Sequence, residues 1–465
     1  MTDKPREACG VFGIYAPGED VARISYFAVY TLQHRGQESA GIATGDGEAI
    51  KLHARMGLVA QVFSEEDLSR LTGKVAIGHN RYSTTGSSKI MNAQPMLADG
   101  PGGIVALGHN GNLTNTKALR AEMAAEGYEF TTTTDTELIT QLFAKSPGQD
   151  QVERIRSAMQ RMKGAFSVVA MTKDALYAVR DPWGVRPLAL GRLKGHWVVA
   201  SETCALDTIG ADFVRDVEPG EIIRIDGDGV HSEVGVPMIR HALCVFEFIY
   251  FARPDSVIDG RLLYLAREEM GRRLAREYPV DADVVIGIPD SATAAGIGYA
   301  QESGIRFTEG LIKSRYIGRT FIQPEQRIRE QGINLKFNPM PGVLAGKRVV
   351  VVDDSIVRGT TTRPIVRLLR RAGAKEVHVR ISSPPYSYPC VLGVDTARRS
   401  ELIAARLSVP EIERFIEADS LGYLSRQSLM EAIGLPQQHF CQACFTGEYP
   451  LPVTVEVDKM ALERK

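Results

Sequence analysis

The segment RVVVVDDSIVRGTTT, residues 348–362, decides the architecture of the second half of the chain. Its run of valines predicts a strand buried on both faces, which is typical of parallel sheets covered by helices. Asp353 and Asp354 end the strand, and a glycine- and threonine-rich loop leads into a helix expected over residues 361–372. Loop N–H groups, hydroxyls and a helix N-terminus can together bind an anion such as phosphate. The alternative is a strand-to-helix turn capped by Asp or Ser. The segment lacks the Gly-x4-Gly-Lys pattern of a Walker A loop.

Helices and apolar strands alternate on both sides of this segment. The expected elements are a helix at 262–277 and strands at 282–288 and 376–381. This alternation predicts an α/β domain with a parallel, doubly wound sheet over residues 255–408. Residues 409–465 contain two short helical patterns, the second starting at the N-cap Ser425, and are predicted to form a helical C-terminal appendage.

The first half of the chain has a different pattern, in which short β-like runs are broken by glycine and asparagine. Strands are expected at 10–15, 75–79, 104–108, 166–171 and 197–200, and helices at 136–143 and 151–162. Strands buried on one face with helices outside them are typical of layered α+β domains. We therefore predict such a domain over residues 9–240.

Composition excludes several functional classes. The 465 residues suit two to four domains, and 44% apolar with 24% charged residues is typical of globular proteins. The 55 Lys and Arg residues balance 56 Asp and Glu residues, which does not support nucleic-acid binding through bulk charge. No apolar run reaches the roughly 18–20 residues of a membrane span, and residues 1–8 lack the apolar region of a signal peptide. Six cysteines are too few for a disulfide scaffold, so we expect a soluble cytoplasmic protein.

Cys9 lies directly before the first expected strand, behind eight mostly polar residues. If residues 1–8 were removed as a propeptide, Cys9 would carry both a thiol and a free α-amine. An α-amine with a pKa of about 8 can act as the base that activates the thiol. The alternative is a small apolar residue at the start of a strand.

Four further segments accompany Cys9 in the first half. They are QHRGQESAG at 33–41, GHNRYSTTG at 78–86, GHNGNLTN at 108–115 and TDTE at 134–137. Each alone is typical of a turn, but their order and spacing resemble those of the N-terminal-nucleophile glutamine amidotransferase domain, a four-layer αββα fold. The resemblance requires removal of residues 1–8, because loss of the initiator Met alone would not expose Cys9.

This resemblance implies a role for each of five residues. Cys9 is the nucleophile, with its own amine as the base, and Asn110 and the N–H of Gly111 form the oxyanion hole. Arg81 pairs with the α-carboxylate of glutamine, and Asp135 holds its α-ammonium group. Without the resemblance, Arg81 is a surface charge and Asp135 a helix cap.

The segment at 348–362 resembles the phosphoribosyl-pyrophosphate motif of type I phosphoribosyltransferases. The resemblance implies that Asp353 and Asp354 hold the ribose hydroxyls and that the following loop binds the 5-phosphate. The loop residues assigned to this binding are Ser355, Val357, Arg358, Gly359, Thr360 and Thr361.

Two more segments fit the same family. The loop in VVIGIPDSAT, residues 284–293, would bind pyrophosphate, and the basic segment KSRYIGRTFIQPEQR, residues 313–327, is interpreted as a mobile loop that closes over the substrate. Its anion-binding side chains would be Lys313, Arg319 and Arg327, unless the segment is only solvated surface. Mg²⁺ is expected with pyrophosphate, and the resemblance places it near Ser291, Asp353 and Asp354.

Cys441 and Cys444 form a CxxC pair, which alone is ambiguous between a metal site, a redox pair and coincidence. The contexts CVFEFIYFARPDS after Cys244 and SSPPYSYPC before Cys390 resemble the iron–sulfur subfamily of glutamine phosphoribosylpyrophosphate amidotransferases. The resemblance implies a [4Fe–4S] cluster on these four cysteines in a structural or oxygen-sensing role, and zinc remains the alternative. Cys204 lacks such a context and is predicted to be a core residue.

Together the motifs make residues 9–450 resemble the amidophosphoribosyltransferase family, in its iron–sulfur subfamily with an N-terminal propeptide. The implied reaction joins the amide nitrogen of glutamine to phosphoribosyl pyrophosphate, giving 5-phosphoribosylamine, glutamate and pyrophosphate in the first step of purine synthesis, with ammonia channelled between the sites. A homotetramer and feedback inhibition by purine nucleotides are implied as well. The alternatives are a glutaminase with another acceptor, as in glucosamine-phosphate synthase or asparagine synthetase, and a phosphoribosyl-pyrophosphate-binding regulator with a decayed glutaminase.

Overall fold

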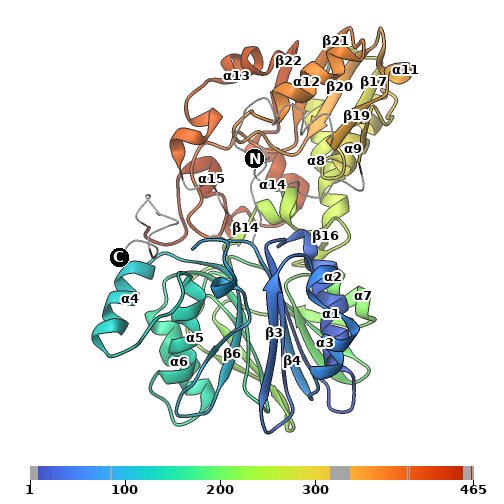
Figure 1. Cartoon of the computed structure of the whole chain (residues 1–465). Coiled ribbons are helices and arrows are strands. Elements are labelled where there is room, and N and C mark those ends of the chain that lie inside the picture. Colours follow the sequence, from blue (N-terminus) through green and yellow to red (C-terminus); the bar gives the residue numbers. More distant parts are fainter. Residues whose placement is uncertain are drawn as a thin grey trace.

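The computed structural model describes residues 9–83, 86–314, 336–394, 396, 398–453 and 462. The predicted propeptide, residues 1–8, lies outside the described residues, as does residue 315 onward of the predicted mobile loop, including Arg319 and Arg327. In the described ranges no helix is both long enough and apolar enough to cross a membrane. Figure 1 shows two halves, a stack of sheets below and an α/β unit above.

The first half contains two antiparallel sheets stacked face to face (Figure 1). One sheet has the order β11-β9-β10-β1-β4-β2-β3, and the other β13-β12-β8-β7-β6-β5. The strands of the first are β1 (Gly10–Tyr15), β2 (Ser39–Gly45), β3 (Ile50–Met56), β4 (Val75–Arg81), β9 (Ala189–Leu193), β10 (His196–Ala200) and β11 (Asp212–Asp216). Those of the second are β5 (Met96–Ala98), β6 (Val105–Leu113), β7 (Gly164–Met171), β8 (Leu176–Arg180), β12 (Glu221–Asp226) and β13 (Gly229–Val234).

Alternation along each strand sends one side chain between the sheets and the next toward a helix layer. In β1, Val11 packs in the cluster between the two sheets, whereas Phe12 packs in the cluster under the outer helices. The helices of this half are α1 (Val21–Thr31), α2 (Val59–Val62), α3 (Glu65–Arg70), α4 (Thr116–Ala125), α5 (Asp135–Lys145), α6 (Gln151–Arg161) and α7 (Thr203–Ile209). The layers are therefore helix, sheet, sheet, helix, which confirms the predicted fold.

The second half is built on a parallel sheet with the order β17-β20-β21-β22. Its strands are β17 (Val284–Gly287), β20 (Arg348–Asp353), β21 (Glu376–Ile381) and β22 (Ser420–Tyr423), and its helices are α8 (Leu263–Glu277), α9 (Thr293–Ser303), α12 (Thr362–Arg371), α13 (Val409–Ile416) and α14 (Arg426–Ile433). Val350 and Val352 pack with residues of α8 and α9, while Val349 and Val351 pack with those of α12 and α13. Because both faces are covered, the strand needs apolar residues at every position, as the valine run predicted.

The chain after residue 408 is not only helical. Ser425 caps α14 as predicted, by accepting the N–H of Ser428 at 3.1 Å. However, β22 lies within these residues and pairs with β21, so the segment extends the parallel sheet. Its four residues are too few to show a strand pattern. Shorter elements of the described part include β14 (Leu243–Cys244), η3 (Glu247–Phe251), β15 (Val257–Ile258), β16 (Arg261–Leu262), β18 (Leu311–Lys313), β19 (Phe337–Pro339), α11 (Pro341–Leu344), β23 (Phe440–Cys441) and α15 (Ala443–Thr446).

Candidate active sites

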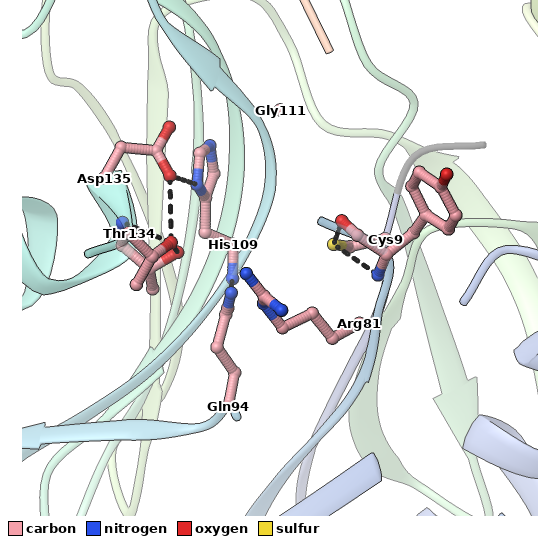
Figure 2. A pocket seen from close by; sticks show the side chains of 9 residues that line it. Cys9, Arg81, Gln94, His109, Gly111, Thr134 and Asp135 are labelled. Carbon is pink, nitrogen blue, oxygen red and sulfur yellow. Dashed lines mark hydrogen bonds and ion pairs between the residues drawn. The ribbon is translucent and has the colours of Figure 1, made fainter. Parts of the chain in front are cut away.

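A pocket in the first half gathers residues from both sheets (Figure 2). Cys9 directly precedes β1, Arg81 ends β4, Gly111 lies in β6, and Asp135 is the first residue of α5. The structure therefore brings four of the five predicted glutaminase residues to one pocket. The described residues that line it are Cys9, Arg81, Tyr82, Gln94, His109, Gly111, Thr134, Asp135 and Thr136.

The thiol of Cys9 is buried and held by the backbone of Tyr82. Its Sγ donates to the carbonyl oxygen of Tyr82 at 3.3 Å and accepts the N–H of the same residue at 3.4 Å (Figure 2). Burial raises the pKa of the Cys9 thiol to about 11, although the Tyr82 hydrogen bond and the charge of Arg81 lower it. Within the described residues, no side chain is hydrogen-bonded to this sulfur. The thiol is therefore protonated near pH 7 and needs a base before it can attack.

Arg81 and Asp135 supply one cation and one anion to the pocket. The Nη1 of Arg81 donates to Glu38 Oε2 and to the carbonyl oxygen of Ser87, both at 3.3 Å. Asp135 accepts the N–H of Leu113 through Oδ2 at 3.0 Å. A guanidinium and a carboxylate in one pocket match the carboxylate and ammonium groups of an α-amino acid.

Asn110 and Gly111 lie next to each other in β6. Both polar atoms of the Asn110 side chain are buried without a partner among the described residues, and Asn110 does not itself line the pocket. Gly111 has φ +150°, and a Cβ there would lie 2.0 Å from the carbonyl oxygen of Ala165, so only glycine fits. A buried amide with free hydrogen-bonding capacity can serve an oxyanion that forms during a reaction.

Sequence reasoning gave no role to two other lining residues, Gln94 and His109. Gln94 Oε1 accepts the backbone N–H of His109 at 2.9 Å, which ties the segment before β5 to β6. The His109 Nδ1 lies 3.8 Å from Asp135 Oδ1, and burial lowers the pKa of its ring. His109 stands within a quoted motif, but Gln94 lies in no pattern that indicates a site.

The predicted phosphate loop follows β20 in the second half. Asp353, Asp354 and Ser355 are buried at the carboxyl end of the strand. The N–H of Asp354 donates to Asp353 Oδ1 at 2.9 Å, and Ser355 Oγ donates to Asp354 Oδ1 at 2.7 Å. Ligands of open α/β sheets bind at this end of the strands.

The loop then runs through residues 357–361 to the N-terminus of α12. Gly359 has φ +73°, and a Cβ there would lie 2.8 Å from Ile403, so the turn requires glycine. Arg358 pairs with Glu401 through Nε and Nη2, at 3.0 and 2.8 Å. Val357 is buried, and its carbonyl oxygen accepts the N–H of Ile403 at 2.9 Å. Thr360 and Thr361 complete the turn into the helix.

Two other predicted ligands of this site are described: Ser291, in the loop after β17, and Lys313, at the end of β18. β17 and β20 are parallel, so the loop after β17, which carries Ser291, opens on the same edge of the sheet as Asp353. Lys313 forms an ion pair with Asp290 in that loop. The structure thus brings Lys313 to the loop that is predicted to bind pyrophosphate.

Four cysteines converge where the two halves meet. Cys244 and Cys441 are register partners in the parallel pair β14–β23, at the boundary in Figure 1. Burial raises the pKa of Cys444, and the charges of Cys244, Cys441 and Cys390 raise it further. Cys390 accepts the N–H of Leu392 at 3.4 Å. Among the residues that the structure describes, no three His, Cys, Asp or Glu side chains are arranged to hold one metal ion. Cys204 is buried, as predicted for a core residue.

Comparisons with known proteins find a matching domain family for each half of the chain. A glutamine amidotransferase domain family matches residues 79–208, and a phosphoribosyl transferase domain family matches residues 258–382. The chain is 54% identical to the amidophosphoribosyltransferase of Synechococcus elongatus over 99% of this chain and 94% of that one. It is 51% identical to the amidophosphoribosyltransferase of Mycobacterium tuberculosis over 98% of this chain and 88% of that one.

A solved structure of glutamine phosphoribosylpyrophosphate amidotransferase from B. subtilis, complexed with ADP and GMP, superimposes with a TM-score of 0.91. It is 47% identical, and the match covers 96% of this chain and 98% of that one. Identity at this level, over nearly the full length, covers both halves of the chain. The chain belongs to the amidophosphoribosyltransferase family.

Proposed function

We propose that this chain transfers the amide nitrogen of glutamine to phosphoribosyl pyrophosphate, giving 5-phosphoribosylamine, glutamate and pyrophosphate in the first step of purine biosynthesis. The observation that carries the proposal is the presence of both sites in one chain, namely the Cys9 pocket and the Asp353–Asp354 loop. A glutaminase with another acceptor does not need a phosphoribosyl transferase domain, and a decayed glutaminase does not need the Cys9 pocket.

In the glutaminase half, Arg81 and Asp135 orient glutamine by its carboxylate and ammonium groups. Cys9 Sγ attacks the side-chain amide carbon, and its proton passes to the α-amine that removal of residues 1–8 exposes. Asn110 Nδ2 and the Gly111 N–H stabilise the oxyanion, for which the unpartnered Asn110 amide is suited. Ammonia leaves, and water then releases glutamate from the thioester.

In the phosphoribosyltransferase half, Asp353 and Asp354 hold the ribose hydroxyls while the loop through Thr361 binds the 5-phosphate. Displacement at C1 needs mainly positioning and stabilisation of the leaving pyrophosphate. Mg²⁺ commonly takes one or two carboxylates and completes its shell with substrate phosphates and water. The oxygen donors at this edge, with Ser291 nearby, fit such an ion, which would neutralise pyrophosphate charge when bound.

Ammonia must reach C1 without being protonated in bulk water, and an enclosed path between the halves would achieve this. The basic segment 313–327 is proposed to close over the substrate and complete that path. Of its three predicted cations, Lys313 is described and already pairs with the pyrophosphate loop.

The four clustered cysteines are proposed to hold a [4Fe–4S] cluster. The charges of Cys244, Cys441 and Cys390 raise the pKa of Cys444, so the four thiols lie near one another, which supports a shared site. Four thiolates suit a [4Fe–4S] cluster, and a zinc ion on the same four thiolates is the alternative. When bound, the cluster would cross-link the segments of Cys244, Cys390 and the CxxC pair.

The remaining family properties are proposals without a residue assignment. A relative in this family was solved with ADP and GMP, which supports purine nucleotides as ligands and feedback inhibitors of this chain. A homotetramer and a cytoplasmic location are proposed on family membership.

The experiment that tests the function compares glutamine with ammonia as the nitrogen source. Wild type should release pyrophosphate with either, whereas Cys9→Ala should use ammonia alone because only glutamine requires the thiol. Intact mass under anaerobic, non-denaturing conditions should show loss of residues 1–8 and a gain of four irons and four sulfides. Full glutamine activity in Cys9→Ala would contradict the nucleophile assignment.

A further inference from the structure

The buried guanidinium of Arg186 forms hydrogen bonds with two segments that lie outside the two sheets of the first half. Arg186 follows β8 and is fully buried. Its Nη1 donates to Glu247 Oε1 at 3.1 Å, and its Nη2 donates to the carbonyl oxygen of Leu392 at 3.2 Å. Glu247 begins η3 at the boundary of the halves, and Leu392 follows the cysteine at position 390. One side chain therefore joins two segments that are far apart in sequence.

The first of these segments leads to the nucleophile. Glu247 also accepts from Arg35, at 2.8 Å to Oε1 and 3.0 Å to Oε2. Arg35 in turn donates through Nε to the carbonyl oxygen of Cys9 at 3.2 Å, and pairs with Glu202. Through Arg35, the position of Glu247 therefore affects the position of the Cys9 backbone.

The second segment, residues 391–393, lies against β6, the strand that carries the predicted oxyanion residues. We call it the bridging segment. Asn112 Nδ2 in β6 donates to the carbonyl oxygen of Val391 at 3.0 Å. A Cβ at Gly393 would lie 3.3 Å from the carbonyl carbon of Gly111 and 2.9 Å from Nη2 of Arg186. The bridging segment thus contacts β6 at Gly111, a predicted oxyanion residue, and at the next residue, Asn112, and it is held there by Arg186.

We propose that Arg186 and the bridging segment form a positioning element for glutamine hydrolysis, through which the second half of the chain fixes both β6 and Cys9. The inference rests on the proposed function. None of these residues lines the pocket, so they act through Gly111 and Cys9 rather than on the substrate. A misplacement of about 1 Å at a reacting group can cost about 10²-fold in rate, so contacts of this kind have catalytic consequences.

A purely structural role predicts something different. If the network only held the halves together, disrupting it would lower glutamine-dependent and ammonia-dependent synthesis in proportion to folded protein. A positioning role predicts loss of the glutamine reaction alone, because ammonia bypasses Cys9 and the oxyanion hole. The ratio of the two rates on the same sample therefore separates the two roles.

Gly393→Ala tests the bridging segment, because its new methyl group would press on Gly111 and Arg186. Gly229→Ala is the matched control: Gly229 has φ +114°, close to +112° at Gly393, and its Cβ would meet nothing within 4 Å. For Gly393→Ala we expect kcat with glutamine to fall about tenfold or more. This loss should be smaller than the roughly 10²–10³-fold loss caused by removing an oxyanion donor outright. KM for glutamine, ammonia-dependent kcat and iron content should stay within about twofold, because Arg81 and the second site are untouched. Gly229→Ala should leave the ratio unchanged.

Arg186→Lys provides a second variant, since lysine keeps the charge but cannot span two acceptors as the guanidinium fork does. It should show the same selective loss, together with slower labelling of Cys9 by an electrophilic glutamine analogue. If both variants lower the two activities in parallel, or leave their ratio at the wild-type value, the positioning role is wrong. If Gly393→Ala does not fold, Arg186→Lys decides by the same ratio. Wild type that fails to use glutamine at all would instead overturn the proposed function.

Discussion

Replacing Asn110 by alanine should separate catalysis from stability in a way that few buried substitutions do. Both polar atoms of its side chain are buried and unpartnered in the described structure. The substitution therefore removes no hydrogen bond from the free enzyme, and it relieves an unsatisfied amide that costs about 1–3 kcal/mol. The small cavity left behind acts in the opposite direction. We expect the free energy of unfolding to change by less than about 1 kcal/mol.

The rate should change far more, because the amide is needed only when the oxyanion forms. Loss of one oxyanion donor costs about 10²–10³ in kcat, equivalent to about 2.7–4 kcal/mol. The assay measures 5-phosphoribosylamine formation at saturating glutamine and again with ammonium, and chemical denaturation measures stability. Glutamine-dependent kcat should fall by that factor, and the ammonia reaction should be unchanged.

Asn92→Ala is the matched control for stability. Asn92 Nδ2 donates to the Ser87 carbonyl oxygen at 2.8 Å and to Thr133 Oγ1 at 2.9 Å, and Oδ1 accepts the Thr133 N–H at 3.1 Å. Removing these three bonds should cost about 3 kcal/mol. If Asn110→Ala is destabilised as much as Asn92→Ala, or keeps glutamine turnover within about threefold of wild type, the oxyanion assignment is refuted.

Further outcomes follow from the other sites. Asp353→Asn combined with Asp354→Asn should abolish synthesis from both nitrogen donors, because the ribose loses its anchors; retained ammonia-dependent synthesis would contradict that role. Burial raises the pKa of Asp216 to about 6, so ionisation of this carboxyl destabilises the folded state. Stability from this group is present below its unfolded pKa of about 4 and is lost as pH rises through about 6. Asp216→Asn should therefore gain stability relative to wild type between about pH 4 and 7, as measured by urea midpoints, and a constant difference would exclude this linkage. Cys444→Ser should lower iron content and the melting temperature, whereas Cys204→Ser should leave iron content unchanged; equal iron in the two variants would contradict the ligand assignment.

The elements that sequence predicted are those whose pattern is local. The valine run of β20 and the cap at Ser425 depend only on neighbouring residues, so both could be predicted from the sequence alone. The same holds for the quoted motifs around Arg81 and Asp135, because each motif sits at the end of one strand or the start of one helix. Strand β22 was not predicted because four residues carry too little periodicity to distinguish a strand from a turn.

The contacts that sequence did not predict join residues far apart in the chain. Arg35 stands within a quoted motif, but its partner Glu247 lies 212 positions away and its role depends on how the two halves dock. Arg186 and Leu392 are separated by 206 positions, and nothing near either residue indicates a pair. Such pairings follow from tertiary register, which local propensity does not determine.

Burial of the Cys9 thiol gives a physical reason for the proposed removal of residues 1–8. The same low-dielectric surroundings that strengthen an oxyanion hole also raise the pKa of the Cys9 thiol to about 11. Full proton transfer to an α-amine with a pKa of about 8 would then cost about 4 kcal/mol, so transfer is expected to accompany attack rather than precede it. While residues 1–8 remain attached, the nitrogen of Cys9 is an amide that cannot accept this proton. The proposed removal of residues 1–8 would therefore supply the missing base to a pocket whose other residues are already in place.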